Sequence, residues 1–242
     1  MSQWRKFDQT WTRWPAQPRG VVELLGGSYL AASPQVSYRR LLEHLYARNL
    51  AVHAWSYVPG FDHQSQANEA WAAFRCCREK LESRVGPVPS SIRLGHSLGC
   101  KLHLLAPDGG RKSHSLIAIS FNNFEAEESI PMLRQLAPRL GIETGFSPGP
   151  DETLQLISNL YIQPKNLLIR FDQDKLDQSQ NLMESLKSRS NDATTQQNLH
   201  GDHLTPASVG LRKNLLGDWA DDSKRAKRLE NLANIIHQWS ST

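Results

Sequence analysis

The most informative part of the chain is the pentapeptide Gly95-His96-Ser97-Leu98-Gly99, which has the pattern Gly-x-Ser-x-Gly. In this pattern a strand turns sharply into a helix, so that the serine hydroxyl stands exposed above the sheet. The turn forces a strained backbone conformation on the serine. It also leaves room only for very small side chains two positions before and two positions after it. The pentapeptide therefore predicts a nucleophile elbow with Ser97 as the nucleophile.

The flanking sequence supplies the strand and the helix that this turn requires. Residues 92–95 form a short apolar run typical of a buried strand, and residues 98–105 have the pattern of a helix. Without that context the motif is weak, and a glycine-serine turn without chemistry is the alternative. The backbone N–H of Leu98 would lie at the helix N-terminus, where the helix dipole favours developing negative charge. We therefore expect Leu98 to be one donor of an oxyanion hole.

Length and composition limit the class of protein. The 242 residues suffice for one α/β domain, and the 39% hydrophobic and 21% charged residues indicate a globular chain. The net charge is only +4 and the basic residues are scattered, so we expect no nucleic-acid partner. Three cysteines form neither a disulfide framework nor a metal-binding spacing, which predicts a reducing compartment and no metal site. We expect no cofactor. Without a long apolar run or a signal-peptide core, the sequence predicts no transmembrane segment and a cytoplasmic location.

Short apolar runs alternate with helix-like stretches along the whole chain. This alternation is typical of a mostly parallel sheet with helices on both faces. We expect a single domain over residues 1–242 with the α/β-hydrolase fold and about six strands. The expected strands cover residues 21–25, 50–57, 92–95, 115–121, 167–171 and 194–199.

Residues 122–165 are too many for a simple connection between two strands. They contain two helix-like pieces, at residues 130–140 and 153–161. The C-terminal ends of the strands are where α/β sheets bind ligands, so we expect this insertion to lie there as a helical cap. Its apolar residues fit either an apolar acyl group of a substrate or the packing of the cap on the body; they are Phe121, Phe124, Met132, Leu133, Leu136 and Phe146.

A serine nucleophile needs a base and an acid that orients the base, and in this fold they follow the serine in the order acid, then histidine. Three aspartates compete for the acid position after the strand at residues 167–171. Asp174 is best placed for the tight loop beyond the strand. Asp172 could instead point along the strand axis, and Asp177 could begin the next helix as its N-cap. We therefore expect Asp174, with Asp172 and Asp177 as alternatives.

The expected base is His203, on the loop after the last strand. Gly201, two residues earlier, allows the bend that brings an imidazole back over the serine. His200 is the competing residue, closer to the strand. The second oxyanion donor should come from the loop after the first strand, where Ser28 or Tyr29 follows two glycines. A glycine turn needed only for chain reversal is the alternative there.

Several segments together resemble the DUF1350 family, a group of uncharacterised cyanobacterial and plant-chloroplast proteins assigned to the α/β-hydrolase superfamily. The segments are residues 25–43, 95–105, 119–123, 146–148, 152–153, 166–169 and 201–206, so the resemblance covers roughly residues 20 to 208. It implies the fold and a cyanobacterial or plastid-type source, and it places the elbow at Ser97 and the late histidine at His203. The resemblance implies no substrate. The chain departs from common hydrolase patterns in having no histidine before Gly26 and no glycine at Phe171.

These features favour an acyl hydrolase of the esterase, thioesterase or lipase type, acting on a small-molecule ester or thioester. In this hypothesis Ser97 attacks the acyl carbonyl, His203 transfers the proton and Asp174 orients His203. A non-catalytic binding or assembly protein with the same fold is the alternative, because fold does not fix function. Acyl transfer to an acceptor other than water would use the same residues. The sequence indicates neither the substrate nor the oligomeric state.

Overall fold

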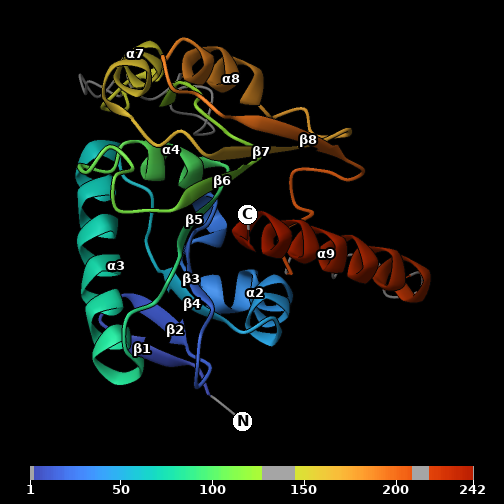
Figure 1. Ribbon diagram of the computed structural model, residues 1–242. Coiled ribbons are helices and arrows are strands. Elements are labelled where there is room, and N and C mark those ends of the chain that lie inside the picture. Colours follow the sequence, from blue (N-terminus) through green and yellow to red (C-terminus); the bar gives the residue numbers. More distant parts are fainter. Residues whose placement is uncertain (1–2, 127–144, 209–217, 242) are drawn as a thin grey trace, which may run out of the picture.

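The computed structural model describes residues 3–126, 145–208 and 218–241. Within these ranges the chain forms an eight-stranded sheet in the order β1-β2-β4-β3-β5-β6-β7-β8 (Figure 1). The strands from β4 to β8 in this order are parallel, whereas β1 and β2 are antiparallel to their neighbours. The bounds are β1 Arg5–Phe7, β2 Thr10–Arg13, β3 Gly20–Leu25, β4 Leu50–Trp55, β5 Ser91–His96, β6 Ser115–Ile119, β7 Asn166–Phe171 and β8 Thr195–Leu199. The mostly parallel sheet of the α/β-hydrolase class is confirmed.

The N-terminal hairpin of β1 and β2 adds two strands to the six that the sequence predicts. β2 pairs antiparallel with β4 and extends the sheet beyond the parallel strands. The buried residues of β2 are Thr10 and Thr12, each 1% exposed. Since the buried positions of this strand are polar, it carries no alternation of apolar and polar residues, and apolar periodicity does not detect it.

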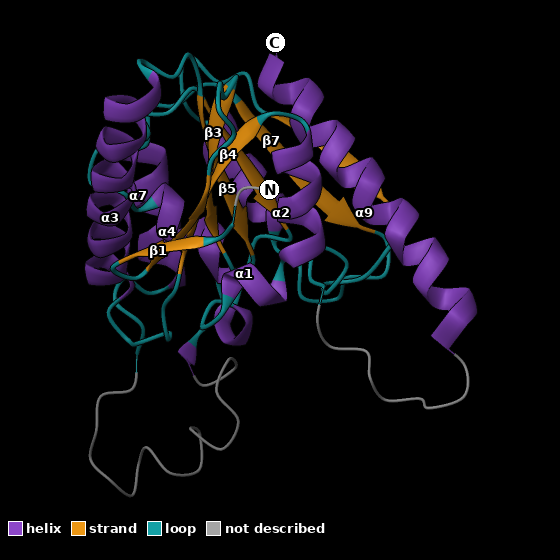
Figure 2. Ribbon diagram, turned by 90° about the horizontal axis from the view of Figure 1, so that it is seen from below, coloured by secondary structure: helices purple, strands orange, loops and turns teal. Residues whose placement is uncertain are grey.

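Helices cover both faces of the sheet (Figure 2). After β3 come the short 3₁₀ turn η1 (Ser28–Leu30) and α1 (Pro34–Ser37). One face carries α2 (Arg39–Ala47) and α9 (Asp218–Ser241), whose apolar side chains pack on β3, β4 and β5. The other face carries α3 (His63–Val85), α4 (Leu98–Leu104), α7 (Pro150–Leu160) and α8 (Ser179–Lys187). This three-layer arrangement buries the central strands β3 to β7 on both sides, whereas the edge strand β8 is polar and partly exposed.

The α7 helix belongs to the body of the domain. Its residue Ile157 is fully buried and packs with Leu116 of β6 and Leu168 of β7, so α7 is the crossover helix between these parallel strands. Phe121 is buried in the same cluster. The helix expected at residues 130–140 lies outside the described residues, as do Met132, Leu133 and Leu136. The cap therefore stays a prediction for the rest of residues 122–165.

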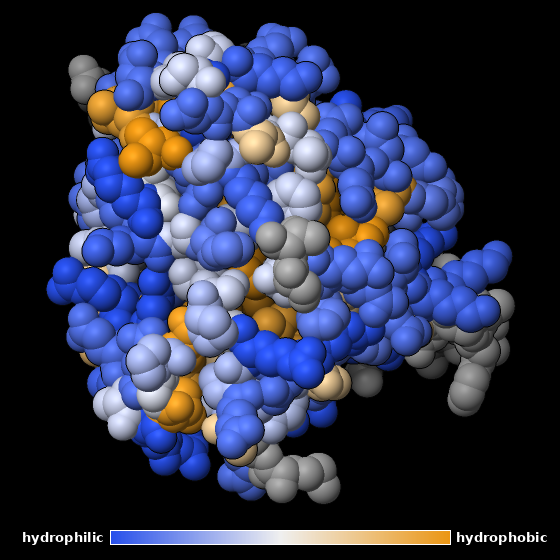
Figure 3. All heavy atoms as spheres, viewed as in Figure 1, coloured by the Kyte–Doolittle hydropathy of each residue, from blue (hydrophilic) through white to orange (hydrophobic). Residues whose placement is uncertain are grey.

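The surface seen in the orientation of Figure 1 is mainly hydrophilic. Its apolar areas are scattered between polar side chains rather than joined into one patch (Figure 3). Among the described residues, no helix combines the length and the apolar character needed to span a bilayer. On this face the described residues thus form no broad apolar docking surface.

Candidate active site

Ser97 occupies the sharp turn between β5 and α4. Its backbone has φ 55° and ψ −123°, a strained conformation for a residue other than glycine. The turn brings α4 so close to the sheet that a Cβ atom on Gly99 would lie 2.0 Å from the carbonyl oxygen of Leu25. A Cβ atom on Gly95 would lie 2.6 Å from Cα of Cys100. Both positions therefore require glycine, and this is the physical basis of the Gly-x-Ser-x-Gly pattern in this chain.

The loops after β7 and β8 bring His203 and Asp174 together. Nδ1 of His203 lies 2.8 Å from Oδ2 of Asp174, whose side chain is fully buried, while that of His203 is 17% exposed. The other carboxylate oxygen of Asp174 accepts a hydrogen bond from the Leu176 N–H at 2.8 Å. Burial raises the pKa of Asp174, but the hydrogen bonds from His203 and the backbone outweigh it and leave the pKa below its ordinary value. Asp174 is therefore a buried carboxylate that stays ionised at neutral pH.

The other two aspartates have different partners. Asp172 contacts His200 at 2.8 Å and accepts a hydrogen bond from the Gly201 N–H at 3.0 Å. The side chains of Asp172 and His200 are both more than half exposed. Asp177 forms an ion pair with Arg170 and accepts a hydrogen bond from Ser179. Asp172 thus stabilises the loop that contains His203 through hydrogen bonds to His200 and Gly201, and Asp177 connects β7 to the start of α8.

His96, the residue before Ser97, links the elbow to the loops on both sides of it. Its Nε2 lies 2.8 Å from the carbonyl oxygen of His203, which can only accept, so Nε2 carries the proton. Nδ1 therefore accepts a hydrogen bond from the hydroxyl of Tyr38 at 2.7 Å, and that hydroxyl accepts from the Gly27 N–H at 2.8 Å. Burial, with His203 as a second cause, lowers the pKa of His96 to about 3, so the ring is neutral. The sequence alone does not predict this role of His96 and Tyr38, although a histidine inside the elbow motif is a signal for it.

The loop after β3 passes next to the nucleophile. A Cβ atom on Gly27 would lie 3.1 Å from Cβ of Ser97, so a larger residue there would crowd the serine. Ser28 and Tyr29 begin the η1 turn directly afterwards, and the first N–H groups of a helical turn have no acceptor within it. The fold thus brings the backbone of Ser28 and Tyr29 to the vicinity of Ser97.

A cavity of about 260 Å³ adjoins the elbow, and we call it the elbow cavity. Leu98 lines it together with Ser28 and Tyr29. Its other walls are of two kinds: the aromatic residues Phe61, Phe124 and Phe146, and the polar residues His63, Lys101 and Asn123. The elbow cavity is therefore a mixed apolar and polar pocket beside the predicted oxyanion donors.

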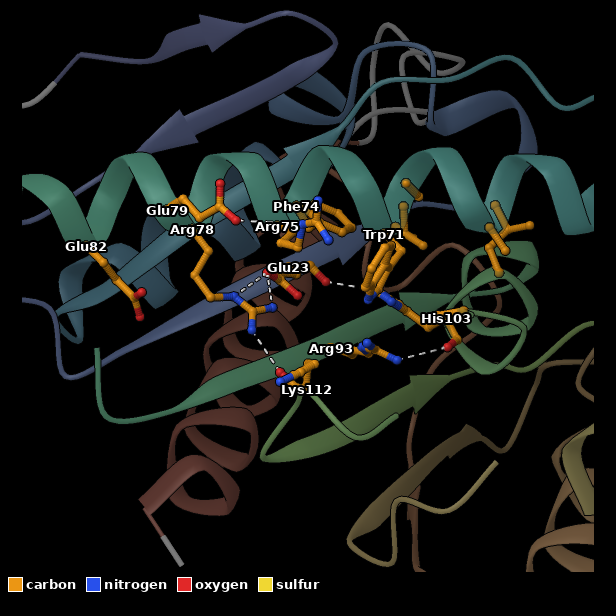
Figure 4. A pocket seen from close by; sticks show the side chains of 15 residues that line it. Glu23, Trp71, Phe74, Arg75, Arg78, Glu79, Glu82, Arg93, His103 and Lys112 are labelled. Carbon is orange, nitrogen blue, oxygen red and sulfur yellow. Dashed lines mark hydrogen bonds and ion pairs between the residues drawn. The ribbon is translucent and has the colours of Figure 1, made fainter. Parts of the chain in front are cut away.

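A larger cavity of about 420 Å³ lies elsewhere, between α3, α4 and the sheet. Figure 4 shows Arg78 of α3 reaching Glu23 of β3, and the two form an ion pair at 2.6 Å. Arg93 forms an ion pair with Asp108 at 2.7 Å and contacts the backbone of His103. Arg78, Glu23 and Arg93 are all held in ion pairs, and the cavity shares no lining residue with the elbow cavity. It is therefore best explained as a gap under α3.

Metal-ligating side chains do not gather at the site. Within residues 3–126, 145–208 and 218–241, no group of three or more histidine, cysteine, aspartate or glutamate side chains could hold a metal ion. The chemistry that the described residues offer is that of a serine hydroxyl, an imidazole and a carboxylate.

Solved structures of several esterases and lipases share this fold. A monoglyceride lipase variant from Saccharomyces cerevisiae has a TM-score of 0.62 at 15% identity, over 99% of this chain and 94% of the lipase. Carboxyl esterase 2 from Tuber melanosporum has a TM-score of 0.63 at 13% identity, over 96% of this chain and 82% of the esterase. A monoacylglycerol lipase from Paleococcus ferrophilus has a TM-score of 0.55 at 15% identity, over 90% and 96% of the two chains. At these identities the similarity shows the fold alone.

A comparison with curated protein sequences gives no match. A family model does match, over residues 3–237, and its description is "Protein of unknown function (DUF1350)". This range includes every segment on which the resemblance in the sequence rests. The chain therefore belongs to the DUF1350 family and has the α/β-hydrolase fold.

Proposed function

We propose that this protein is a serine hydrolase that cleaves an ester or thioester bond with Ser97 as nucleophile, His203 as base and Asp174 as the orienting acid. The observation that carries the proposal is the 2.8 Å contact between Nδ1 of His203 and the buried carboxylate of Asp174. The loop that contains His203 is bound to the elbow through the hydrogen bond from Nε2 of His96 to the His203 carbonyl oxygen. The shared fold of lipases and esterases adds support.

The first half of the proposed reaction forms an acyl-enzyme. The contact with Asp174 places the proton of the neutral His203 ring on Nδ1, which leaves Nε2 to accept the proton of the Ser97 hydroxyl. Oγ of Ser97 then bonds to the acyl carbon, and the carbonyl oxygen becomes an oxyanion. When the bond to the leaving alcohol or thiol breaks, His203 returns the proton to the leaving group.

Backbone donors stabilise the oxyanion. The N–H of Leu98 lies at the start of α4, and the N–H of Ser28 or Tyr29 supplies the second hydrogen bond from the η1 turn. In the second half of the reaction water attacks the acyl-enzyme, again with His203 as the base, and the acid and free Ser97 are released. Ionised Asp174 stabilises the imidazolium in both halves.

A substrate screen tests this function. Purified full-length protein is assayed with p-nitrophenyl esters and acyl-CoA thioesters of increasing chain length, next to Ser97→Ala and a control, Ser83→Ala, on the exposed side of α3. We expect turnover of at least one ester, unchanged in Ser83→Ala and reduced by roughly 10³-fold or more in Ser97→Ala. Equal turnover by wild type and Ser97→Ala would overturn the proposal. Absence of turnover across the panel would favour a non-catalytic role.

A further inference from the structure

Among the described residues, the buried ammonium group of Lys101 has two partners, the Pro148 carbonyl and the ring of Phe146, whose centre lies 5.9 Å from Nζ. Lys101 lies one turn after Leu98 on α4, is 0% exposed, and lines the elbow cavity. Its Nζ donates a hydrogen bond to the Pro148 carbonyl at 2.9 Å. Among the described residues, no carboxylate lies within the 4.0 Å that an ion pair requires. Since an ammonium group has three donors and buried charges are normally paired, Lys101 is left with donors and a charge for a ligand.

Two further polar groups on the same cavity have unused hydrogen-bonding capacity. His63 is 1% exposed, and neither of its ring nitrogens has a hydrogen-bond partner among the residues that the structure describes. Burial, with Lys101 as a second cause, lowers the pKa of His63 to about 3, so the neutral ring offers one donor and one acceptor. The side-chain nitrogen of Asn123 donates a hydrogen bond to the Pro150 carbonyl at 2.9 Å, which fixes the amide, while its Oδ1 has no partner in the described part of the chain.

The loop at residues 146–149 holds these groups in place. The Ser147 carbonyl accepts hydrogen bonds from the N–H groups of His63 and Gln64 at the start of α3, at 2.8 and 3.2 Å. The ring of Phe146 packs on that of His63, with 4.3 Å between their centres. The loop therefore joins α3 to Lys101 and builds one wall of the cavity, a role that accounts for the Phe146-Ser147-Pro148 motif.

We propose that the elbow cavity is a subsite for an anionic group of the substrate, a carboxylate or phosphate on a short aliphatic stem, and that Lys101 binds this anion. The inference rests on the proposed function, since it names the class of ester that Ser97 would attack. Phe61, Phe124 and Phe146 provide the apolar contacts for the stem, and the neutral His63 supplies a second donor. Oδ1 of Asn123 accepts a hydrogen bond from a hydroxyl or N–H group next to the anion.

This subsite differs from an apolar acyl pocket, which is one of the two uses that the sequence leaves open for the apolar residues of the expected cap. Of those residues, Phe124 and Phe146 line the elbow cavity, but they share it with Lys101 and His63. An uncharged alkyl group in the cavity would leave the buried ammonium group without an ion-pair partner among the described residues, which is costly for a buried charge.

Binding of small anions tests the subsite without relying on catalysis. Isothermal titration calorimetry measures the affinity of wild type and of Ser97→Ala for glutarate, for propyl phosphate and for the neutral analogue glutaramide. Lys101→Met removes the charge at nearly constant volume, and His63→Leu removes the second donor. Lys165→Met is the matched control. Nζ of Lys165 is also withdrawn from solvent and has no hydrogen-bond partner within the described ranges, but Lys165 directly precedes β7 and does not line the elbow cavity.

We expect one of the anions to bind wild type and Ser97→Ala alike, with at least tenfold weaker binding to Lys101→Met, weaker binding to His63→Leu and unchanged binding to Lys165→Met. The tighter of glutarate and propyl phosphate identifies the anionic group. Three outcomes would each overturn the proposal: neither anion binds, glutarate and glutaramide bind equally, or the anion affinity is unchanged in Lys101→Met.

Kinetics separate this proposal from the proposed function. The ratio of kcat/KM for the p-nitrophenyl half ester of glutarate to that for p-nitrophenyl butyrate is measured in the same variants. We expect a ratio of at least ten in wild type and near one in Lys101→Met. If anions bind at Lys101 but no ester is hydrolysed, the proposed hydrolase function is contradicted and the proposed anion subsite stands. If Ser97 hydrolyses esters but the protein shows neither a charge preference nor anion binding, the proposed anion subsite is contradicted and the proposed hydrolase function stands.

Discussion

Nδ1 of His203 lies 2.8 Å from Oδ2 of Asp174, although 29 residues separate them in the chain. They meet because β7 and β8 are parallel neighbours and each residue follows the C-terminal end of its strand. Ser97 follows the C-terminal end of β5 in the same sheet. The proposed nucleophile, base and acid therefore share one edge of the sheet, where α/β proteins bind their ligands.

The acid should be identified by comparing three variants with the same chemical change. Asp174→Asn removes the charge that fixes and stabilises His203, so we expect kcat/KM to fall by roughly 10³- to 10⁴-fold. Asp172→Asn and Asp177→Asn leave that contact in place, and we expect losses of less than tenfold. The measurement is kcat/KM on the best ester of the screen. A larger loss in Asp172→Asn or Asp177→Asn than in Asp174→Asn would contradict the assignment.

The hydroxyl of Tyr38 should act as a positioning group for the elbow. Tyr38→Phe leaves the Gly27 N–H and Nδ1 of His96 without their buried partner. We expect the free energy of unfolding to fall by about 1–3 kcal/mol. Because Gly27 borders Ser97, we also expect kcat to fall more than KM changes. A purely structural role would show the stability loss with kcat unchanged, and urea unfolding together with steady-state kinetics distinguishes the two.

Close contact between α4 and β3 should make Gly99 intolerant of any side chain. In Gly99→Ala the added Cβ atom would lie 2.0 Å from the Leu25 carbonyl oxygen, so α4 must move or the protein must unfold. We expect a loss of at least roughly 1–3 kcal/mol in urea unfolding. Gly60→Ala is the control, since its added Cβ atom would have 3.8 Å to the nearest atom. Similar stability of the two variants would argue against the described packing of α4.

Four buried histidines should make the fold sensitive to acid. Burial is the main cause that lowers the pKa of His53, His63, His96 and His103 from 6.5 to about 3. Between these values the unfolded chain binds more protons than the folded chain, so the free energy of unfolding falls as pH decreases from 6.5 towards 3. Urea unfolding at pH 7, 6, 5 and 4 should show this decline. His53→Gln should be less stable than wild type at pH 7, but its free energy of unfolding should fall less as the pH decreases. A free energy of unfolding that does not depend on pH in wild type would contradict this prediction.

The charge preference of the elbow cavity should fade in alkaline solution. Burial lowers the pKa of Lys101 to about 8, and the nearby Glu125 and Glu152 partly oppose this shift. His63, which faces the same cavity, is neutral throughout this range. Lys101 therefore loses its charge as pH rises through about 8, and the preference for the glutarate half ester over butyrate should fall between pH 7 and 9. In Lys101→Met the ratio should not depend on pH, and a constant wild-type ratio from pH 6 to 9 would contradict the assignment.

The sequence predicts the parallel part of the sheet because most of its strands are short apolar runs between helices; the edge strand β8 is the polar exception. It does not predict the hairpin of β1 and β2, since Thr10 and Thr12 occupy the buried positions of β2. It also assigns α7 to a cap, because an amphipathic pattern shows that one face is buried but not which surface buries it. Ile157 shows that the surface is the sheet.

The candidate site is predictable where local backbone geometry limits the choice of residue. The two glycines that flank Ser97 predict it as the nucleophile. The order of acid and histidine along the chain limits the other two candidates to the loops that contain Asp174 and His203. Spacing alone leaves three aspartates open, since their partners depend on how two loops meet. Tyr38 and Lys101 escape prediction for a related reason: their contacts, to His96 and to Pro148, join segments 58 and 47 residues apart.

Labelling with a fluorophosphonate probe tests the central claim most directly. The folded wild type is treated with the probe, and intact mass and peptide mapping locate the adduct. The proposed triad predicts one adduct, on Ser97, that is absent in Ser97→Ala and forms much more slowly in His203→Ala. Lack of any adduct on folded wild type, or an adduct that persists in Ser97→Ala, would contradict it.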